Sequence, residues 1–159
     1  MKIASLNELK KTLKNLEPEE VTALCLRLAK FKKENKELLT YCLYEADNEA
    51  AFVESVKQEM SEAFQEINIR QLYLAKKTIR KVLRIAQKHS KYSGIAETQI
   101  ALLLHFCEEM KATKVKIRQH KVLQNLYERQ LATIQKLLLG LHEDLQSDYA
   151  PQFQELSRY

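Results

Sequence analysis

Apolar residues recur along the chain with the three- and four-residue spacing of amphipathic helices. The pattern is most regular near the C-terminal end, where the separations are four, three, four, three and four residues. This heptad-like seam predicts one long helix that is weakened, but not ended, by Gly140. The seam positions are Tyr127, Leu131, Ile134, Leu138, Leu141 and Leu145. Such a seam also offers a route to self-association.

Capping residues mark where several earlier helices begin. Ser5 and Glu8 form a capping box, and Pro18 suits the first turn of a second helix. We expect Asn35 to separate that helix from a third, and Asp47-Asn48 to precede a fourth that runs to about Ile67. The second helix is expected to bury Val21, Leu24, Cys25, Leu28 and Phe31.

The pattern continues with a helix to about His89, whose apolar side is expected to hold Leu72, Ala75, Ile79, Val82, Leu83 and Ala86. Gly94 follows as a residue suited to left-handed backbone. A sixth helix is expected over 97–112, with Ile100, Leu103, Leu104, Cys107 and Met110 inward. Alternating Val115, Lys116, Ile117 and Arg118 indicate an extended connector. Asp148 is expected to cap a final short helix whose first turn contains Pro151.

Turn-forming residues are scarce, since the 159 residues include only two glycines and two prolines. A β-rich fold needs many such residues, whereas long helices need few. The sequence therefore predicts an all-α fold, a single domain over 1–159. We expect about seven or eight helices packed as antiparallel helical hairpins, in a bundle or a short α-solenoid.

Two segments, ALCLRLAKFKK from Ala23 and ALLLHFCEEMK from Ala101, place apolar residues at similar positions. Paired helices with leucine-rich inner faces resemble helical-hairpin repeats of the HEAT or armadillo kind. The resemblance implies a curved scaffold that binds a partner on one face. A compact bundle explains the same pattern.

The stretch from Ile67 to Ala96 contains eight Lys or Arg residues and no acid, in a chain whose net charge is +5. On a helix these bases would lie opposite the apolar positions, as a stripe that suits the phosphates of a nucleic acid. The candidate contacts are Arg70, Lys76, Lys77, Arg80, Lys81, Arg84, Lys88 and Lys91. Tyr73 and Tyr92 lie near this face and could stack on bases. A second acid-free run, Lys111 to Lys121, could extend it.

The preceding helix is acidic on its expected outer face, which leaves an alternative for the basic stripe. Its acids are Glu49, Glu54, Glu59, Glu62 and Glu66. Because the two helices are consecutive, acids and bases could pair within the monomer, each exposed pair contributing about 0–1 kcal/mol. The pattern leaves both interpretations open.

No catalytic, cofactor or metal site is evident from the residue pattern. Two glycines cannot build a phosphate-cradling loop or a dinucleotide fingerprint. His105 and Glu109 share a helical face and could bind a metal ion together with His142 and Glu143. The ordinary alternative is that these side chains form local hydrogen bonds. His105 and Cys107 point apart on a helix and cannot act together. We therefore expect no enzyme activity and no cofactor.

The cysteine pattern and the hydropathy of the chain indicate in which compartment of the cell to expect the protein. Cys25, Cys42 and Cys107 are odd in number and lack paired spacing, as is typical of reduced, mostly buried thiols in the cytoplasm. The first residues lack the apolar core of a secretory leader and eighteen apolar residues never run together, so we expect neither a leader nor a membrane span. We expect a protein partner or self-association, with nucleic acid as the alternative and no membrane partner.

Overall fold

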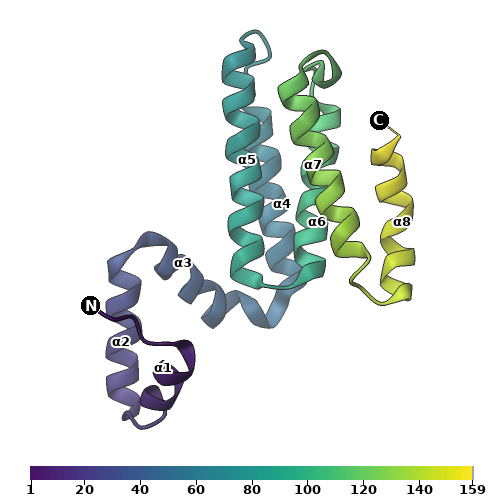
Figure 1. The fold of residues 1–159 in the computed structure, drawn as a ribbon. Helices are drawn as coiled ribbons and strands as arrows, with labels where there is room; N and C mark the ends of the chain where they lie inside the picture. Colours follow the sequence, from purple (N-terminus) through teal and green to yellow (C-terminus); the bar gives the residue numbers. More distant parts are fainter. Residues whose placement is uncertain (159) are drawn as a thin grey trace. The chain divides into compact units, whose positions relative to one another are not determined.

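The computed structural model describes residues 1–158, over which the chain forms α-helices and short helical turns and no strand (Figure 1). The predicted all-α fold is confirmed. The chain divides into two compact units, Met1–Tyr44 and Glu45–Tyr159. No linker composition marks this division in the sequence.

The N-terminal unit consists of α1 (Leu6–Leu13), α2 (Pro18–Phe31) and α3 (Lys33–Thr40), and α3 leads into a π-helical turn, Tyr41–Glu45. The predicted capping box begins α1: Ser5 Oγ accepts from the backbone N–H of Glu8, and the Glu8 carboxylate accepts from the N–H of Ser5 at 2.8 Å. The hydrogen bonds that the Ser5 N–H and the Ser5 hydroxyl donate to the Glu8 carboxylate lower the pKa of this carboxyl. The cap is therefore present above the ordinary pKa of Glu8 and is lost as the pH falls through the lowered value.

The break between α2 and α3 falls at Lys32, three residues before the position expected from Asn35. Lys32 is extended, with φ −143° and ψ 146°. Asn35 nevertheless helps to end α2, because its side-chain amide donates to the Leu28 carbonyl at 2.8 Å. That carbonyl is one of the four that a helix end leaves without an intrahelical donor.

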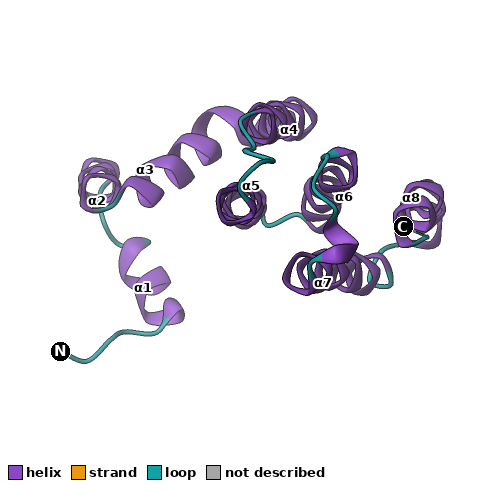
Figure 2. Ribbon diagram, turned by 90° about the horizontal axis from the view of Figure 1, so that it is seen from above, coloured by secondary structure: helices purple, strands orange, loops and turns teal. Residues whose placement is uncertain are grey.

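The C-terminal unit is a stack of antiparallel helices with short connections. Its helices are α4 (Glu49–Gln65), α5 (Leu72–Ser93), α6 (Ala96–Ala112), α7 (Lys121–Leu138) and α8 (Glu143–Ser157). Seen from above, α4, α6 and α8 form one layer, and α5 and α7 form the other (Figure 2). Because α6 contacts α4, α5, α7 and α8, it is the central helix of this unit.

The core of the C-terminal unit is built around α6. Its buried apolar residues are Ile100, Leu102, Leu103, Leu104, Phe106, Cys107 and Met110. These positions cover more of the helix than the single predicted face, because neighbouring helices lie on several sides of α6. From α5, the predicted positions Ala75, Ile79, Val82 and Ala86 are all buried. Gly94 then adopts φ +70°, the left-handed conformation expected of it.

The prediction of one helix through the heptad seam is wrong, because α7 ends at Leu138 and α8 begins at Glu143. The N–H of Gly140 donates to the Leu137 carbonyl and that of Leu141 to the Leu138 carbonyl, the tight spacing of a helix end. The seam is thus divided between two helices and a turn. Tyr127, Ile134 and Leu138 are buried, and Leu131, Leu141 and Leu145 are half-buried.

The prediction of a short final helix capped by Asp148 is also wrong. His142 precedes α8 and caps it, with Nδ1 accepting from the N–H of Asp144 at 3.4 Å. Pro151 lies inside the helix, where it cannot donate a helical hydrogen bond. Beyond it, Leu156 is buried, and Tyr127 Oη donates to the Leu156 carbonyl at 3.0 Å. These contacts hold the second half of α8 against α7.

Candidate interaction surfaces

The bases predicted as anion contacts lie on and just before α5. Lys76 and Lys88 are half-buried, and the others, Arg70, Lys77, Arg80, Lys81, Arg84 and Lys91, are exposed. At 100° per residue, the bases from Lys76 to Lys91 occupy one side of α5. The opposite side carries Ala75, Ile79 and Val82 into the core. The predicted division of α5 into an apolar and a basic face is therefore present.

Most of these bases have no acidic partner. Within residues 1–158, no carboxylate oxygen lies within 4.0 Å of the charged nitrogens of Arg70, Lys76, Lys77, Arg80, Lys81, Arg84 or Lys91. The helices α4 and α5 do share a polar contact, since Glu59 Oε2 lies 3.4 Å from His89 Nε2. The acids of α4 therefore do not neutralise this group of seven bases, which we call the basic face.

Glu49 does not belong to the exposed acidic surface that the sequence predicted. It is half-buried at the start of α4 and accepts hydrogen bonds from Thr98 Oγ1 and, at 2.5 Å, from Ser93 Oγ. These donors lie at the end of α5 and in the first turn of α6. Glu49 therefore joins three helices of the C-terminal unit.

The two tyrosines near the basic face differ in their surroundings. Tyr73 is 76% exposed in the first turn of α5. Tyr92 is half-buried and meets the His89 ring edge-to-face, with centroids 5.7 Å apart. The Lys88 ammonium lies 6.0 Å from the Tyr92 ring centroid. Of the two, Tyr73 presents the accessible ring.

The second basic run lies at the end of the unit where α5 begins. The α4–α5 connection, which contains Arg70, and the α6–α7 connection lie at the same end (Figure 1). In the latter, Val115 and Ile117 are buried while Lys116 and Arg118 are exposed. Ile117–Gln119 forms a 3₁₀ turn rather than a fully extended segment.

The predicted pair His105 and Glu109 belongs to a hydrogen-bonded cluster with Ser61 of α4. Ser61 Oγ donates to Glu109 Oε1 at 2.7 Å and lies 2.9 Å from His105 Nε2. Since the Ser61 proton goes to the carboxylate, Nε2 must carry the proton it shares with Ser61 Oγ and the Lys57 carbonyl. In this arrangement His105 is a donor and not a base for Ser61, which favours local hydrogen bonding over nucleophile activation.

Glu108 also lies beside this cluster, with Oε2 4.0 Å from His105 Nδ1. Over residues 1–158, no group of three or more His, Cys, Asp or Glu side chains has an arrangement that would hold a metal ion. His142 is exposed and serves as the cap of α8.

The cysteines differ in accessibility. Cys107 is buried, and burial, with a smaller effect of Glu108, raises the pKa of its thiol to about 12. Cys25 is half-buried and Cys42 is exposed, so the expectation of mostly buried thiols is wrong for Cys42. The three thiols are free.

The apolar face of α2 that the sequence predicted to be buried is largely exposed, since Leu24, Leu28 and Phe31 are exposed and Val21 and Cys25 are half-buried. Helices α1, α2 and α3 contain no buried residue. Leu28 and Phe31, expected to face the core, are 60% and 76% exposed. Tyr41, after α3, is the one buried residue among residues 1–44.

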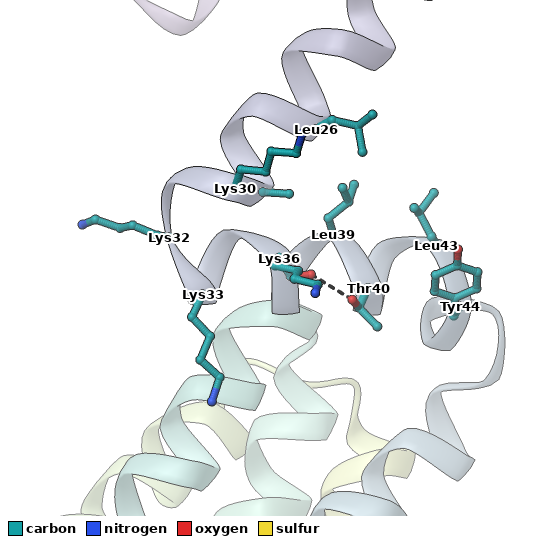
Figure 3. A pocket seen from close by; sticks show the side chains of 10 residues that line it. Leu26, Lys30, Lys32, Lys33, Lys36, Leu39, Thr40, Leu43 and Tyr44 are labelled. Atoms are coloured by element: carbon teal, nitrogen blue, oxygen red, sulfur yellow. Dashed lines mark hydrogen bonds between the residues drawn. The ribbon is translucent and has the colours of Figure 1, made fainter.

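Between α2 and α3 lies a groove that the sequence did not identify (Figure 3). It has a volume of about 610 Å³. Its lining combines leucines with Lys30, Lys32, Lys33 and Lys36. The sequence feature that could have indicated this groove is the segment from Arg27 to Lys36, which contains five bases and one acid, Glu34.

Comparison with known proteins gives no family for this chain. No family model matches it, and no curated protein or solved structure matches it either. The resemblance to HEAT and armadillo repeats therefore stays a prediction. Across residues 1–158, no helix combines the length and the apolar character needed to cross a membrane.

Proposed function

We propose that this chain is a non-catalytic interaction protein that presents helical surface to a macromolecular partner. The observation that carries the proposal is the exposure of large apolar side chains in the N-terminal unit, where Leu26, Leu28 and Phe31 are each more than half exposed. Leu28 and Phe31, with the exposed Leu24, lie on one side of α2, and a contiguous exposed apolar surface on a folded protein is typical of an interaction site. The free thiols of Cys25, Cys42 and Cys107 favour a cytoplasmic setting for this role.

Site-specific photo-crosslinking tests the proposal. A photoreactive amino acid in place of Phe31 should give defined crosslinked products in cells of the native host. The same group in place of the exposed Asn125 of α7 is the control, since Asn125 lies in the other unit. Products of equal yield at both positions, or none from the Phe31 position, would refute an interaction at the N-terminal unit.

Nucleic-acid binding through α5 is the second candidate function, and the basic face without acidic partners favours it. Because no carboxylate among residues 1–158 lies within 4.0 Å of these bases, phosphates need not compete with carboxylates for them. Such contacts are strongest at low salt and read little sequence. Failure to bind mixed-sequence DNA or RNA at about 50 mM salt would eliminate this candidate.

A further inference from the structure

The groove of the N-terminal unit has an apolar floor between two helices. Leu26 and Ala29 come from α2, Leu39 comes from α3, and Leu43 follows it (Figure 3). Leu26 is 51% exposed and Leu43 is 60% exposed, so these side chains offer apolar contact area to another molecule.

Lysines surround this floor. Lys30 and Lys36 lie beside the groove, whereas Lys32 and Lys33 project outward from the α2–α3 turn (Figure 3). Among residues 1–158, Lys30, Lys32 and Lys36 have no acidic partner within 4.0 Å. Lys33 lies 3.5 Å from Glu37, but its side chain is 85% exposed, and exposed pairs of this kind exchange readily with other anions.

We propose that this groove binds an acidic amphipathic helix of a protein partner, an inference that rests on the interaction function proposed above. A helix that carries leucines on one face would place them against Leu26, Leu39 and Leu43. Glutamates or aspartates on its flanks would meet the surrounding lysines, so charge complementarity selects acidic over basic helices. The helix α2, which forms one wall of the groove, has 14 residues and is therefore about 21 Å long at 1.5 Å per residue.

A second copy of this chain is a poorer occupant. In α4 the apolar residues Phe52, Val56 and Met60 are buried in the C-terminal unit, so only its polar face is available. In α1 the exposed leucines are accompanied by Lys10 and Lys11, which would meet the groove lysines with like charge. Neither helix therefore presents an apolar face flanked mainly by acids, since α1 carries the single acid Glu8 beside Lys10 and Lys11.

Binding of a labelled model peptide to the full chain tests the inference. The probe is a fluorescein-labelled helix-forming peptide of about 18 residues, with leucine on one face and glutamate elsewhere. Fluorescence anisotropy should show saturable binding below about 100 µM at low salt. A peptide with lysine in place of each glutamate should bind at least about tenfold more weakly.

Paired variants locate the site. Leu26→Asp should weaken peptide binding by about tenfold or more, whereas Leu28→Asp, on the same helix but outside the groove, should leave it unchanged. Lys30→Glu with Lys36→Glu should weaken binding by about tenfold, and the same charge change at Lys10 and Lys11 of α1 should have little effect. Circular dichroism of each variant checks that the helices remain folded.

Each alternative occupant gives a different result. Equal losses from the groove and α1 charge pairs would indicate general electrostatic attraction and overturn the inference. A dimer in light scattering that Leu26→Asp dissociates would assign the groove to a second copy. Binding of vesicles containing phosphatidylserine without peptide binding would assign it to a lipid surface. If no peptide binds but a photoreactive group in place of Phe31 still crosslinks a partner, only the inference about the groove is overturned. Failure of that crosslinking overturns the proposed function itself.

Discussion

Neutralising the centre of the basic face should change the salt dependence of nucleic-acid binding by a predictable amount. Six bases of α5 have no acidic partner within residues 1–158, namely Lys76, Lys77, Arg80, Lys81, Arg84 and Lys91. At 100° per residue they fall within a sector of about 140°, so one strand of phosphates could meet all of them. Arg80 and Arg84 lie near the middle of that sector, and both are exposed.

The magnitude follows from counterion release. If each of the six bases neutralises one phosphate, the slope of log K against log salt is about −5 for duplex DNA. Affinity then falls about 10³-fold between 50 and 200 mM salt. Arg80→Gln with Arg84→Gln should reduce the slope to about −3.5 and the fall to about 150-fold. Glutamine keeps the helix propensity of arginine, so α5 should remain folded.

Anisotropy titrations with a labelled mixed-sequence duplex at several salt concentrations provide the measurement. Lys10→Gln on α1 with Lys14→Gln at its C-terminal cap is the matched control, because it removes the same charge from exposed positions of the N-terminal unit. The control should keep the wild-type slope. An unchanged slope in the Arg80 and Arg84 variant, or an equal change in the control, would show that α5 is not the phosphate-binding helix.

Three further predictions concern stability and thiol chemistry. Gly94→Ala should lower the free energy of unfolding by about 1–2 kcal/mol in urea denaturation, because φ is +70° and no other group crowds the added methyl. A thiol reagent should modify Cys42 in the native protein near pH 8 but Cys107 only after unfolding, since burial raises the pKa of the Cys107 thiol to about 12. Phe106→Ala should cost about 3–5 kcal/mol of thermal or chemical stability, whereas Phe31→Ala should change it by less than about 0.5 kcal/mol.

The helix α5 could be predicted from its sequence because its apolar and basic residues separate cleanly around the helix. The buried positions Ala75, Ile79 and Val82 all belong to the predicted apolar face. The end of α5 could be predicted from Gly94, since a left-handed residue is needed directly after the helix. Both predictions depend only on residues near one another in sequence.

The break between α7 and α8 could not be predicted, because the heptad spacing continues through it. Gly140 weakens a helix by only about 1 kcal/mol relative to Ala, which does not by itself end one. What decides the break is tertiary packing: α8 turns back onto α6 and α7 and buries Leu156. The burial of one leucine side chain contributes about 1.5–3 kcal/mol, more than the roughly 1 kcal/mol by which Gly140 weakens a continuous helix.

The cluster of Ser61, His105 and Glu109 could be predicted from the sequence only in part. His105 and Glu109 are four residues apart on α6, which is why the sequence identified them as neighbours. Ser61 is 44 residues from His105 and joins them only because α4 packs against α6. Its hydroxyl nevertheless decides the chemistry, because donation to Glu109 leaves His105 as a hydrogen-bond donor.

The exposed face of α2 has the same spacing as the buried face of α5, so periodicity alone could not distinguish them. The difference lies in the helices available to cover each face. The neighbours α1 and α3 have eight residues each, against fourteen in α2, and the whole unit has only 44 residues. A unit near 40 residues is too small to exclude water from a core of its own. Leu28 and Phe31 are therefore exposed for lack of covering helices, and a partner that covers the face would gain the burial that α1 and α3 cannot provide.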